Sequence, residues 1–294
     1  MTSAAFGEPL GSPQPWPAPA KLNLCLHIVG RRNDGYHLLQ TAMQFIDLCD
    51  ELHFYRRPAG VIERVAGNVD IPADADLVIR AARLLATQTA ALQGVAIALN
   101  KRIPIQGGLG GGSSDAATVL VALNKLWGVG LDEDALARLG LQLGADVPFF
   151  VRGRAAWAEG VGERLTPVDF PEAAFLVVKP DAAVSTAAIF QAAELTRNSP
   201  ITTIRAFLAE GGRNDCAASV CGRYPAVSQA LDWLKQFGDA RLTGTGACVF
   251  LPAADESVAR GLLARLDARW QGYSVRGLNK SPLLGRLVVE PPRE

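Results

Sequence analysis

A glycine-rich loop limits what this chain can fold into more than any other stretch. Residues 104–117 read PIQGGLGGGSSDAA, and five of the six residues in 107–112 are glycine. Without a Cβ, successive residues can turn their backbone N–H groups toward one point. The SSD triplet at 113–115 then carries the signals of a helix start. Such a junction of loop and helix is typical of a site that holds phosphate groups.

The elements on either side of the loop support this interpretation. Residues 95–103 alternate large apolar side chains with small or polar ones and end at Pro104, which predicts a strand. From residue 116 onward, apolar residues recur at helical spacing until Gly128, which predicts a helix. The expected order is therefore strand, glycine loop, helix.

Two familiar phosphate-binding motifs do not fit the loop. A P-loop places Lys directly after its last glycine, but here Ser113 follows Gly112. A dinucleotide fingerprint, G-x-G-x-x-G, places its third glycine three residues after the second. Here Gly108 and Gly110 match the first two positions, but Ser113 stands at the third. Phosphates must therefore be held in another way. A mobile linker or a close-packed turn stays open as an alternative that involves no ligand.

Composition excludes several classes of protein. The chain has 294 residues, 49% of them hydrophobic and 20% charged, which fits one large or two ordinary globular domains. The 29 basic and 29 acidic residues cancel and form no long run, which argues against a nucleic-acid partner. We expect no membrane partner and a cytoplasmic location, because no apolar stretch has the length of a membrane span and the N-terminus does not resemble a signal peptide. The five scattered cysteines, none in a CxxC pair, argue against structural zinc and disulfides.

The first predicted strand, residues 20–29, has two distinct faces. Leucine and isoleucine occupy every second position, and Lys21, Asn23, Cys25 and His27 occupy the others. The polar face is either the solvent side of an antiparallel sheet or, with Lys21 and Asn23, the wall of a cleft for an anionic substrate. The proline-rich residues 1–16 before it predict a loose tail.

Patterns along the rest of the chain predict mixed helices and strands. A turn at 33–35 leads to extended runs at 36–48 and 52–55, and a soft domain boundary is expected at 161–167. Helices are expected at 77–87 after Asp76, at 133–143 after Asp132, and at 185–190, 201–210, 226–237 and 256–266. Strands are expected at 175–178 and 286–289, and residues 241–251 contain a second glycine-containing stretch. This order indicates two α+β layers.

Asp146 is an acidic residue in apolar company. It stands between the glycine that ends a predicted helix and a Val-Pro-Phe-Phe run. One interpretation is a capping or turn aspartate, and the other is a functional carboxylate.

At this point four stretches together point to a family. The loop PIQGGLGGGSSDAA resembles the central motif of the GHMP kinases, which include galactose, homoserine and mevalonate kinases. The stretches PAKLNLCLHIVGRRNDGYH (19–37), LGADVPFFVRG (143–153) and RLTGTGACVF (241–250) narrow the resemblance to the branch that acts on a cytidyl diphosphate ester of methylerythritol in the non-mevalonate isoprenoid pathway. The resemblance runs from about residue 18 to 284.

The resemblance implies a fold and a reaction. The fold is a two-domain α+β GHMP kinase: a flexible tail at 1–17, an N-terminal ATP-binding domain at 18–162, and a C-terminal α+β sandwich at 163–294, with the active site between the domains. The implied reaction is phosphorylation of the 2-hydroxyl of the small-molecule substrate, cytidyl diphosphate methylerythritol, with ATP and Mg²⁺ as cofactors. The protein would be a monomer or a homodimer.

The resemblance also implies roles for individual residues. Asp146 would be the catalytic base and Lys21 its cationic partner, in agreement with the need of a hydroxyl nucleophile for a positioned carboxylate. The implied ATP site consists of Lys101, Pro104, Ile105, Gln106, Gly107, Gly108, Leu109, Gly110, Gly111, Gly112, Ser113 and Ser114. The implied substrate site consists of Asn23, Tyr36, His37, Thr186 and Phe190.

The substrate base is expected to stack between Tyr36 and Phe190, although both can also be read as ordinary packing aromatics. Ser113 or Ser114 would reach the metal, and the motifs identify no carboxylate ligand for it.

Two residues depart from the family pattern. Gln106 stands where a glycine is expected, which leaves the loop conformation open there. Asp76 stands where the family often has Asn, which puts an adenine contact in doubt. The alternatives are a homoserine-type or mevalonate-type kinase, or a catalytically silent sensor on the same fold, against which the presence of both Lys21 and Asp146 argues.

Overall fold

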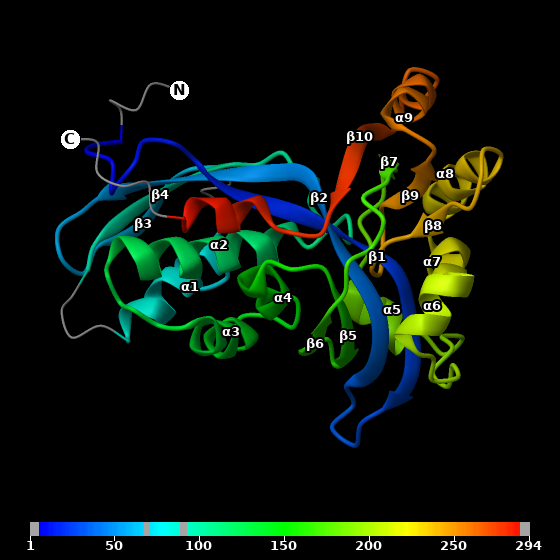
Figure 1. Cartoon of the computed structure of the whole chain (residues 1–294), viewed down its shortest axis with the longest axis horizontal. Coiled ribbons are helices and arrows are strands. Elements are labelled where there is room, and N and C mark those ends of the chain that lie inside the picture. Colours follow the sequence, from blue (N-terminus) through cyan, green and yellow to red (C-terminus); the bar gives the residue numbers. More distant parts are fainter. Residues whose placement is uncertain (1–5, 68–70, 89–92, 289–294) are drawn as a thin grey trace.

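Two long antiparallel strands organise the molecule. In the computed structural model, which describes residues 6–67, 71–88 and 93–288, β1 (Trp16–Arg31) and β2 (His37–Arg56) pair along most of their length. Figure 1 shows this hairpin running from one half of the molecule into the other. Two separate cores pack against its two ends, and most residues of both strands are buried.

The first body lies around the open end of the hairpin, where β1 begins and β2 ends. Strand β4 (Val95–Asn100) pairs with β2, and β3 (Ile62–Ala66) adds to β4 in parallel. A further hairpin, β5 (Ala156–Gly160) and β6 (Arg164–Pro167), pairs with β2 through β5. Helices α1 (Leu77–Ala86), α2 (Gly111–Leu126), α3 (Glu133–Leu141) and α4 (Val147–Arg152) lie together on one side of β1 and β2 (Figure 1).

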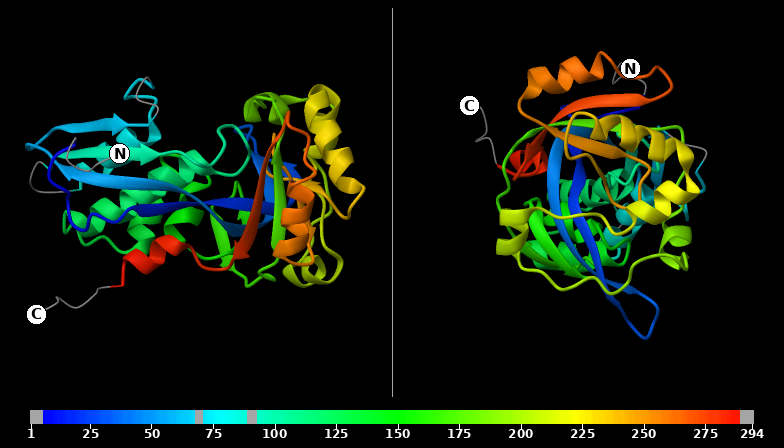
Figure 2. Two further views of the ribbon diagram at one scale, coloured as in Figure 1. Left: turned by 90° about the horizontal axis from the view of Figure 1, so that it is seen from above. Right: turned by 90° about the vertical axis from the view of Figure 1, so that its right-hand side faces the viewer.

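The second body extends the same sheet. Its strands are β7 (Ala174–Lys179), β8 (Arg241–Leu242), β9 (Val249–Ala253) and β10 (Gln271–Leu278), and the path of the sheet is β3-β4-β2-β10-β7-β9-β8. Its helices are α5 (Thr186–Gln191), α6 (Ile204–Glu210), α7 (Ala217–Arg223), α8 (Pro225–Lys235) and α9 (Glu256–Leu263). Figure 2 shows the two bodies at opposite ends of the molecule. Within the described residues, no helix has both the length and the apolar character to cross a bilayer.

The end of the chain returns to the first body. The short 3₁₀ helix η2 (Pro282–Arg286) packs against β1, and Leu283 is buried in the first core. The strand predicted at 286–289 is therefore wrong for residues 286–288, and Val289 lies outside the described residues.

The proline-rich segment is packed in its described part, so the predicted loose tail is wrong there. Leu10 and Trp16 are buried, and the backbone N–H of Leu10 donates to the carbonyl of Phe54 at 2.8 Å. Apolar anchors of this kind hold a segment that has little secondary structure of its own. Residues 1–5 lie outside the described part.

The polar face of β1 is buried as well. Bulges after Pro19, Asn23 and Ile28 break the strict alternation, and Lys21 and Asn23 are both less than 5% exposed. The interpretation of this face as the solvent side of the sheet is therefore wrong.

Local helix signals had mixed outcomes. Asp76 and Asp132 cap α1 and α3 as predicted, because their side chains accept backbone N–H groups of the first turn. The predicted Ser-Ser-Asp start of α2 is wrong: Gly110 occupies the N-cap in a left-handed conformation, and the helix begins at Gly111. The sequence patterns also missed β3, β5, β6, β10, α4 and α7. The predicted boundary at residue 162 falls inside the β5–β6 hairpin.

Candidate active site

The glycine loop is held by backbone hydrogen bonds on both sides. The N–H of Lys21 in β1 donates to the carbonyl of Leu109 at 3.0 Å. On the other side, the N–H of Cys248 donates to the carbonyl of Gly107 at 3.0 Å. The loop is therefore fixed between the first body and residues 243–248 of the second.

Two positions in the loop require glycine. Gly108 has φ +75°, and a Cβ there would lie 2.4 Å from the carbonyl oxygen of Thr243. Gly110 has φ +73°, and a Cβ there would lie 2.7 Å from Cζ of Phe150. At both positions the positive φ disfavours a side chain, and the carbonyl of Thr243 or the ring of Phe150 occupies the space that a Cβ would need.

Gln106 has the left-handed conformation that explains why a glycine is expected there. Its φ is +54°, and no other non-glycine residue in the described ranges has a positive φ. This conformation costs an L-residue about 1–2 kcal/mol. Gln106→Gly should therefore raise the free energy of unfolding by up to about 1 kcal/mol, after the flexibility of glycine in the unfolded chain is counted. Denaturant titration measures the change.

Gln142 offers a matched control for this substitution. It is exposed and has an ordinary helical φ of −70°. Gln142→Gly should lower the free energy of unfolding by about 0.5–1 kcal/mol, because glycine only adds flexibility there. If Gln106→Gly were destabilising by a similar amount, backbone strain would not be the dominant effect at residue 106.

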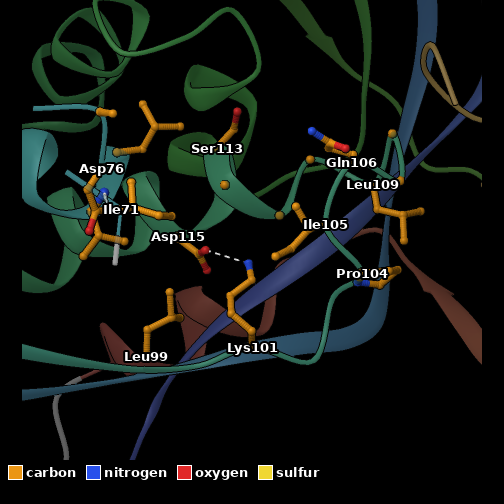
Figure 3. Close-up of a pocket in the computed structure, with 18 of the residues that line it drawn as sticks. Ile71, Asp76, Leu99, Lys101, Pro104, Ile105, Gln106, Leu109, Ser113 and Asp115 are labelled. Carbon is orange, nitrogen blue, oxygen red and sulfur yellow. Dashed lines mark hydrogen bonds and ion pairs between the residues drawn. The ribbon is translucent and has the colours of Figure 1, made fainter. Parts of the chain in front are cut away.

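A cavity of about 550 Å³ lies along the loop. Lys101 and every residue from Pro104 to Ser113 line it, as expected for the ATP site, and Figure 3 shows several of these residues together with Ile71 and Asp76. Ser114 does not line it. The hydroxyl of Ser114 is fully buried, because α2 begins three residues before it and turns this side chain into the protein. The expected contact of Ser114 with ATP or metal is therefore not supported.

Lys101 belongs to a charged cluster beneath the loop. Its Nζ donates to Oδ2 of Asp115 at 2.8 Å (Figure 3) and also to Oδ2 of Asp50. Oδ1 of Asp50 accepts the backbone N–H groups of Arg102 and Ile103 at 2.6 and 2.8 Å. The cluster thus fixes the chain where β4 leads into the glycine loop.

Asp115 gives the cluster a pH dependence. Burial raises the pKa of its carboxyl to about 7, against the lowering effect of Lys101 and with a smaller rise from Asp50. A carboxyl with a raised pKa costs stability progressively as the pH rises from about 4 to about 7, and fully above that. The melting temperature of Asp115→Asn, relative to that of the unmodified protein, should therefore increase between about pH 5 and about pH 8.

The exposed Asp74 provides the control for this measurement. Its side chain is 95% exposed and pairs with Arg83 at the surface. Asp74→Asn should show the same difference in melting temperature at every pH in this range. A pH-independent difference for Asp115→Asn would contradict the assignment of a raised pKa to Asp115.

Asp76 lies at the far end of the same cavity. Its Oδ1 accepts the N–H of Val78 at 2.9 Å, and its Oδ2 lies 3.0 Å from Nε of Arg64. Both side chains of this ion pair are buried. Each carboxylate oxygen of Asp76 therefore already has a protein partner.

A second cavity, of about 390 Å³, adjoins the first. The two share Gly108, Gly110, Ser113 and Thr186. Lys21, Asn23, Asp146 and Phe190, all predicted site residues, also line the second cavity. The structure thus brings both expected catalytic residues into the second cavity, with Cε of Lys21 next to Gly110, one of the shared residues.

Lys21 and Asp146 form an ion pair in the second cavity. Nζ of Lys21 lies 3.6 Å from Oδ2 of Asp146, and the two side chains are 4% and 38% exposed. Asp146 precedes α4 but its side chain makes no capping hydrogen bond, so the interpretation as a capping residue is wrong. Its carboxylate is left to face the cavity.

Asn23 fixes the position of Lys21. Nζ of Lys21 donates to Oδ1 of Asn23, and Nδ2 of Asn23 donates to the hydroxyl of Thr41 at 2.8 Å. That hydroxyl in turn donates to the carbonyl of Cys25 at 2.6 Å. The chain of donors sets the orientation of the Asn23 amide, so that its oxygen faces Lys21. Thr41 was missed from the sequence, because nothing distinguishes it from other strand threonines.

The aromatic residues expected around the substrate base are arranged differently from the prediction. Tyr36 is 64% exposed and lines neither cavity. The ring of His37 stacks directly on Phe190, with centroids 5.0 Å apart and planes 22° apart. The expected pairing of Tyr36 with Phe190 across a base is therefore not formed, because His37 covers one face of Phe190.

The second glycine loop, Gly244-Thr245-Gly246, also contributes to this cavity. Gly244 and Thr245 line it, and the Thr245 hydroxyl lies 2.8 Å from that of Thr186. Other lining residues that the sequence did not single out are Leu26, Leu39, Met43, Ala145, Val161 and Gly162. They are small or apolar and come from separate elements, so no local pattern marked them.

Comparison with known protein families gives two matches along the chain. Residues 76–154 match the GHMP kinases N terminal domain, and residues 192–272 match the GHMP kinases C terminal domain. The glycine loop and Asp146 both fall within the first match.

Individual proteins are similar over nearly the whole chain. The 4-diphosphocytidyl-2-C-methyl-D-erythritol kinase of Alkalilimnicola ehrlichii is 58% identical over 275 residues, covering 94% of each chain. That of Nitrosococcus oceani is 55% identical over 269 residues, covering 92% of this chain and 96% of the other.

Solved structures agree with these relatives. A crystal structure of 4-(cytidine 5'-diphospho)-2C-methyl-D-erythritol kinase superposes with a TM-score of 0.77 at 33% identity, covering 89% of this chain and 98% of that one. The mevalonate kinase of Methanococcus jannaschii gives a TM-score of 0.65 at 16% identity, covering 92% and 99%, which shows a shared fold. The predicted two-domain α+β fold is confirmed.

Proposed function

The chain belongs to the GHMP kinases and, among them, to the 4-diphosphocytidyl-2-C-methyl-D-erythritol kinases, and from this membership we propose its reaction in detail. The γ-phosphoryl group of ATP is transferred to the 2-hydroxyl of 4-diphosphocytidyl-2-C-methyl-D-erythritol. The products are the 2-phosphate and ADP, in the non-mevalonate route to isoprenoids.

One observation carries the proposal: the cavity that contains the Lys21–Asp146 ion pair shares Gly108, Gly110 and Ser113 with the cavity along the glycine loop. A kinase needs a phosphate donor on one side of the reacting oxygen and a hydroxyl acceptor on the other. The cavity along the glycine loop suits the donor, and the cavity lined by Asn23 and Phe190 suits the acceptor.

Asp146 acts as the general base. Its carboxylate is partly exposed to the second cavity, where it can accept the proton of the 2-hydroxyl as the oxygen attacks phosphorus. Lys21 is held beside it by Asn23, and its ammonium group stabilises the negative charge that gathers on the reacting oxygens.

The glycine loop holds the triphosphate. Gly111, Gly112 and Ser113, the first residues of α2, line the first cavity, and the positive end of the helix dipole favours phosphate there. Because φ at Gly108 and Gly110 is positive, the loop can bring its backbone close to the phosphates without a side chain between them.

The site offers a nucleotide-bound magnesium ion only a small number of protein ligands. Among the described residues, no group of three or more His, Cys, Asp or Glu side chains could hold a metal. Mg²⁺ bound to a nucleotide usually needs only one or two protein ligands besides phosphate oxygens and water. The hydroxyl of Ser113, which lines both cavities, would hold the ion, and the ion would neutralise phosphate charge.

The remaining residues of the second cavity recognise the rest of the substrate. Thr186 and Phe190 of α5 line it, and His37 stacks on Phe190 at its edge. An aromatic surface suits a cytosine ring, and hydroxyl groups suit a diphosphate or a polyol. Tyr36, at the exposed hairpin tip, contributes only if the tip closes over the base.

The test is a turnover assay with ATP and three acceptors in parallel: the diphosphocytidyl substrate, mevalonate and homoserine. We expect ADP release that depends on the cytidyl compound and is at least about 100-fold less efficient with the other two. A preference for mevalonate or homoserine would overturn the proposed substrate, and no turnover with any acceptor would favour a silent sensor.

A further inference from the structure

Arg197 joins Phe190, which lines the second cavity, to His37, which stacks on Phe190 outside that lining. It follows α5, and its Nε donates to Nε2 of His37 at 3.1 Å. Its two terminal nitrogens donate to three carbonyl oxygens of the segment before it: Leu195 at 3.1 Å, Phe190 at 3.0 Å and Ala192 at 2.6 Å. One guanidinium group therefore holds both the end of α5 and the imidazole of His37.

The hydrogen bond from Arg197 determines which nitrogen of His37 carries the proton. A guanidinium nitrogen can only donate, so Nε2 of His37 must accept with its lone pair. The neutral ring then carries its hydrogen on Nδ1. This nitrogen is the one hydrogen-bonding atom of the ring left for a ligand, and it is a donor.

The surroundings of His37 keep the ring neutral. Partial burial lowers the pKa of His37, and the positive charges of Arg197 and Arg31 lower it further. Arg31 lies directly opposite His37 in the β1–β2 pairing, and Phe190, which packs against the ring, is uncharged.

Arg197 also fixes the partner of that ring. Phe190 lines the second cavity, and the guanidinium group that binds His37 also binds the backbone carbonyl of Phe190. Arg197 thus forms a hydrogen bond to each residue of the stacked His37–Phe190 pair.

We propose that Arg197 is a positioning residue for recognition of the nucleobase: it presents His37 as an Nδ1–H donor, stacked on Phe190, at the edge of the substrate cavity. The proposal rests on the proposed function, which places a cytosine ring there. Cytosine offers acceptors at N3 and O2, whereas uracil carries a hydrogen on N3. A donor that is directed at N3 and cannot change to an acceptor therefore favours cytosine over uracil, whereas a donor directed at O2 would not distinguish them.

The first experiment compares Arg197→Lys and Arg197→Met with Arg260→Lys, a substitution of an exposed arginine whose partner is Glu256 on the surface of α9. Steady-state kinetics would give kcat and KM for ATP, for the cytidyl substrate and for its uridyl analogue. For both Arg197 variants we expect KM of the cytidyl substrate to rise about tenfold, with kcat and KM of ATP within about twofold. The preference for cytidyl over uridyl should fall, and the control should change nothing.

The second experiment observes His37 directly, without turnover. Two-bond ¹H–¹⁵N correlation spectra of the protein distinguish the two neutral tautomers, and a His37→Gln variant identifies the signals of His37. We expect the Nδ1–H form in the unmodified protein and a mixture in Arg197→Lys. In Arg197→Met, which removes the positive charge beside the ring, the pKa of His37 should rise.

A double variant tests whether Arg197 acts through His37. If it does, adding Arg197→Lys to His37→Gln should change KM of the cytidyl substrate by less than about twofold. The proposal would be overturned if kcat fell and KM rose by similar factors for both ATP and the cytidyl substrate. It would also be overturned if the tautomer of His37 were unchanged in Arg197→Lys. If the cytidyl compound is not a substrate at all, the proposed function fails, and the spectra still decide whether Arg197 sets the tautomer.

Discussion

Asp146→Asn is expected to lower kcat by at least about 100-fold while leaving the affinity for ATP nearly unchanged. The amide has the size of the carboxylate but cannot accept the proton of the attacking hydroxyl. The side chain makes no capping hydrogen bond, and Lys21 keeps its hydrogen bond to Asn23, so the variant should fold normally. Single-turnover kinetics with saturating substrates, together with nucleotide binding by calorimetry, would measure the two effects separately.

The control for this prediction is Asp169→Asn, which removes an exposed carboxylate after β6. It should retain normal kcat, so that a loss of negative charge alone is excluded as the cause. Turnover of Asp146→Asn within about tenfold of the unmodified protein would remove this residue from the role of general base.

Gly108→Ala should destabilise the protein more than a comparable substitution at Gly112 or Gly128. The new Cβ would lie 2.4 Å from the carbonyl oxygen of Thr243 and 3.0 Å from that of Gly246. Neither contact can be relieved by a side-chain rotation, because both partners are backbone atoms. Adding the strain of a positive φ, we expect a loss of about 3 kcal/mol or more in the free energy of unfolding. KM of ATP should rise at least about tenfold, because the loop must shift to fit the methyl group.

The two other glycines separate the contributions. Gly128 has φ +66° and open space around its Cβ position, so Gly128→Ala measures backbone strain alone, about 1–2 kcal/mol. Gly112 has no positive φ, and its Cβ would make ordinary contact with Leu77 at 3.5 Å. Gly112→Ala should therefore leave the melting temperature almost unchanged. If Gly108→Ala were no less stable than Gly128→Ala, the close approach to residues 243–246 would not be what requires glycine.

Features that depend on residues close together in the sequence were predicted better than features that depend on distant residues. Asp76 and Asp132 were read correctly as helix starts because their partners lie two or three residues away. The glycine loop was placed correctly between β4 and α2 for the same reason. The exact residue at which α2 begins was not predicted. Gly110 adopts the αL conformation at a point where Phe150 and Lys21, from other elements, lie in the space that a side chain would need.

The site itself was predictable mainly through resemblance. Lys21 and Asp146 are far apart in the chain, and each alone had an ordinary structural explanation, so only the family motifs joined them. The stacking of His37 on Phe190 was not foreseen, because it depends on Arg197, which sits in a segment without a motif. The sequence left open whether the polar face of β1 is a solvent face or the wall of a cleft, because the elements that bury Lys21 and Asn23 lie far away in the chain.

The shared β1–β2 hairpin has a consequence for how the chain folds during synthesis. Leu26 and Ile28 leave the ribosome among the first residues, but their core partners include Leu251, near the other end of the chain. At roughly 5–20 residues per second, this apolar surface waits on the order of 10 s or more for its cover. Even the first core is completed only when Leu283 emerges. The nascent chain therefore exposes a long β-ribbon until residues 251 and 283 have been synthesised, and chaperones that bind extended apolar segments have that interval in which to act.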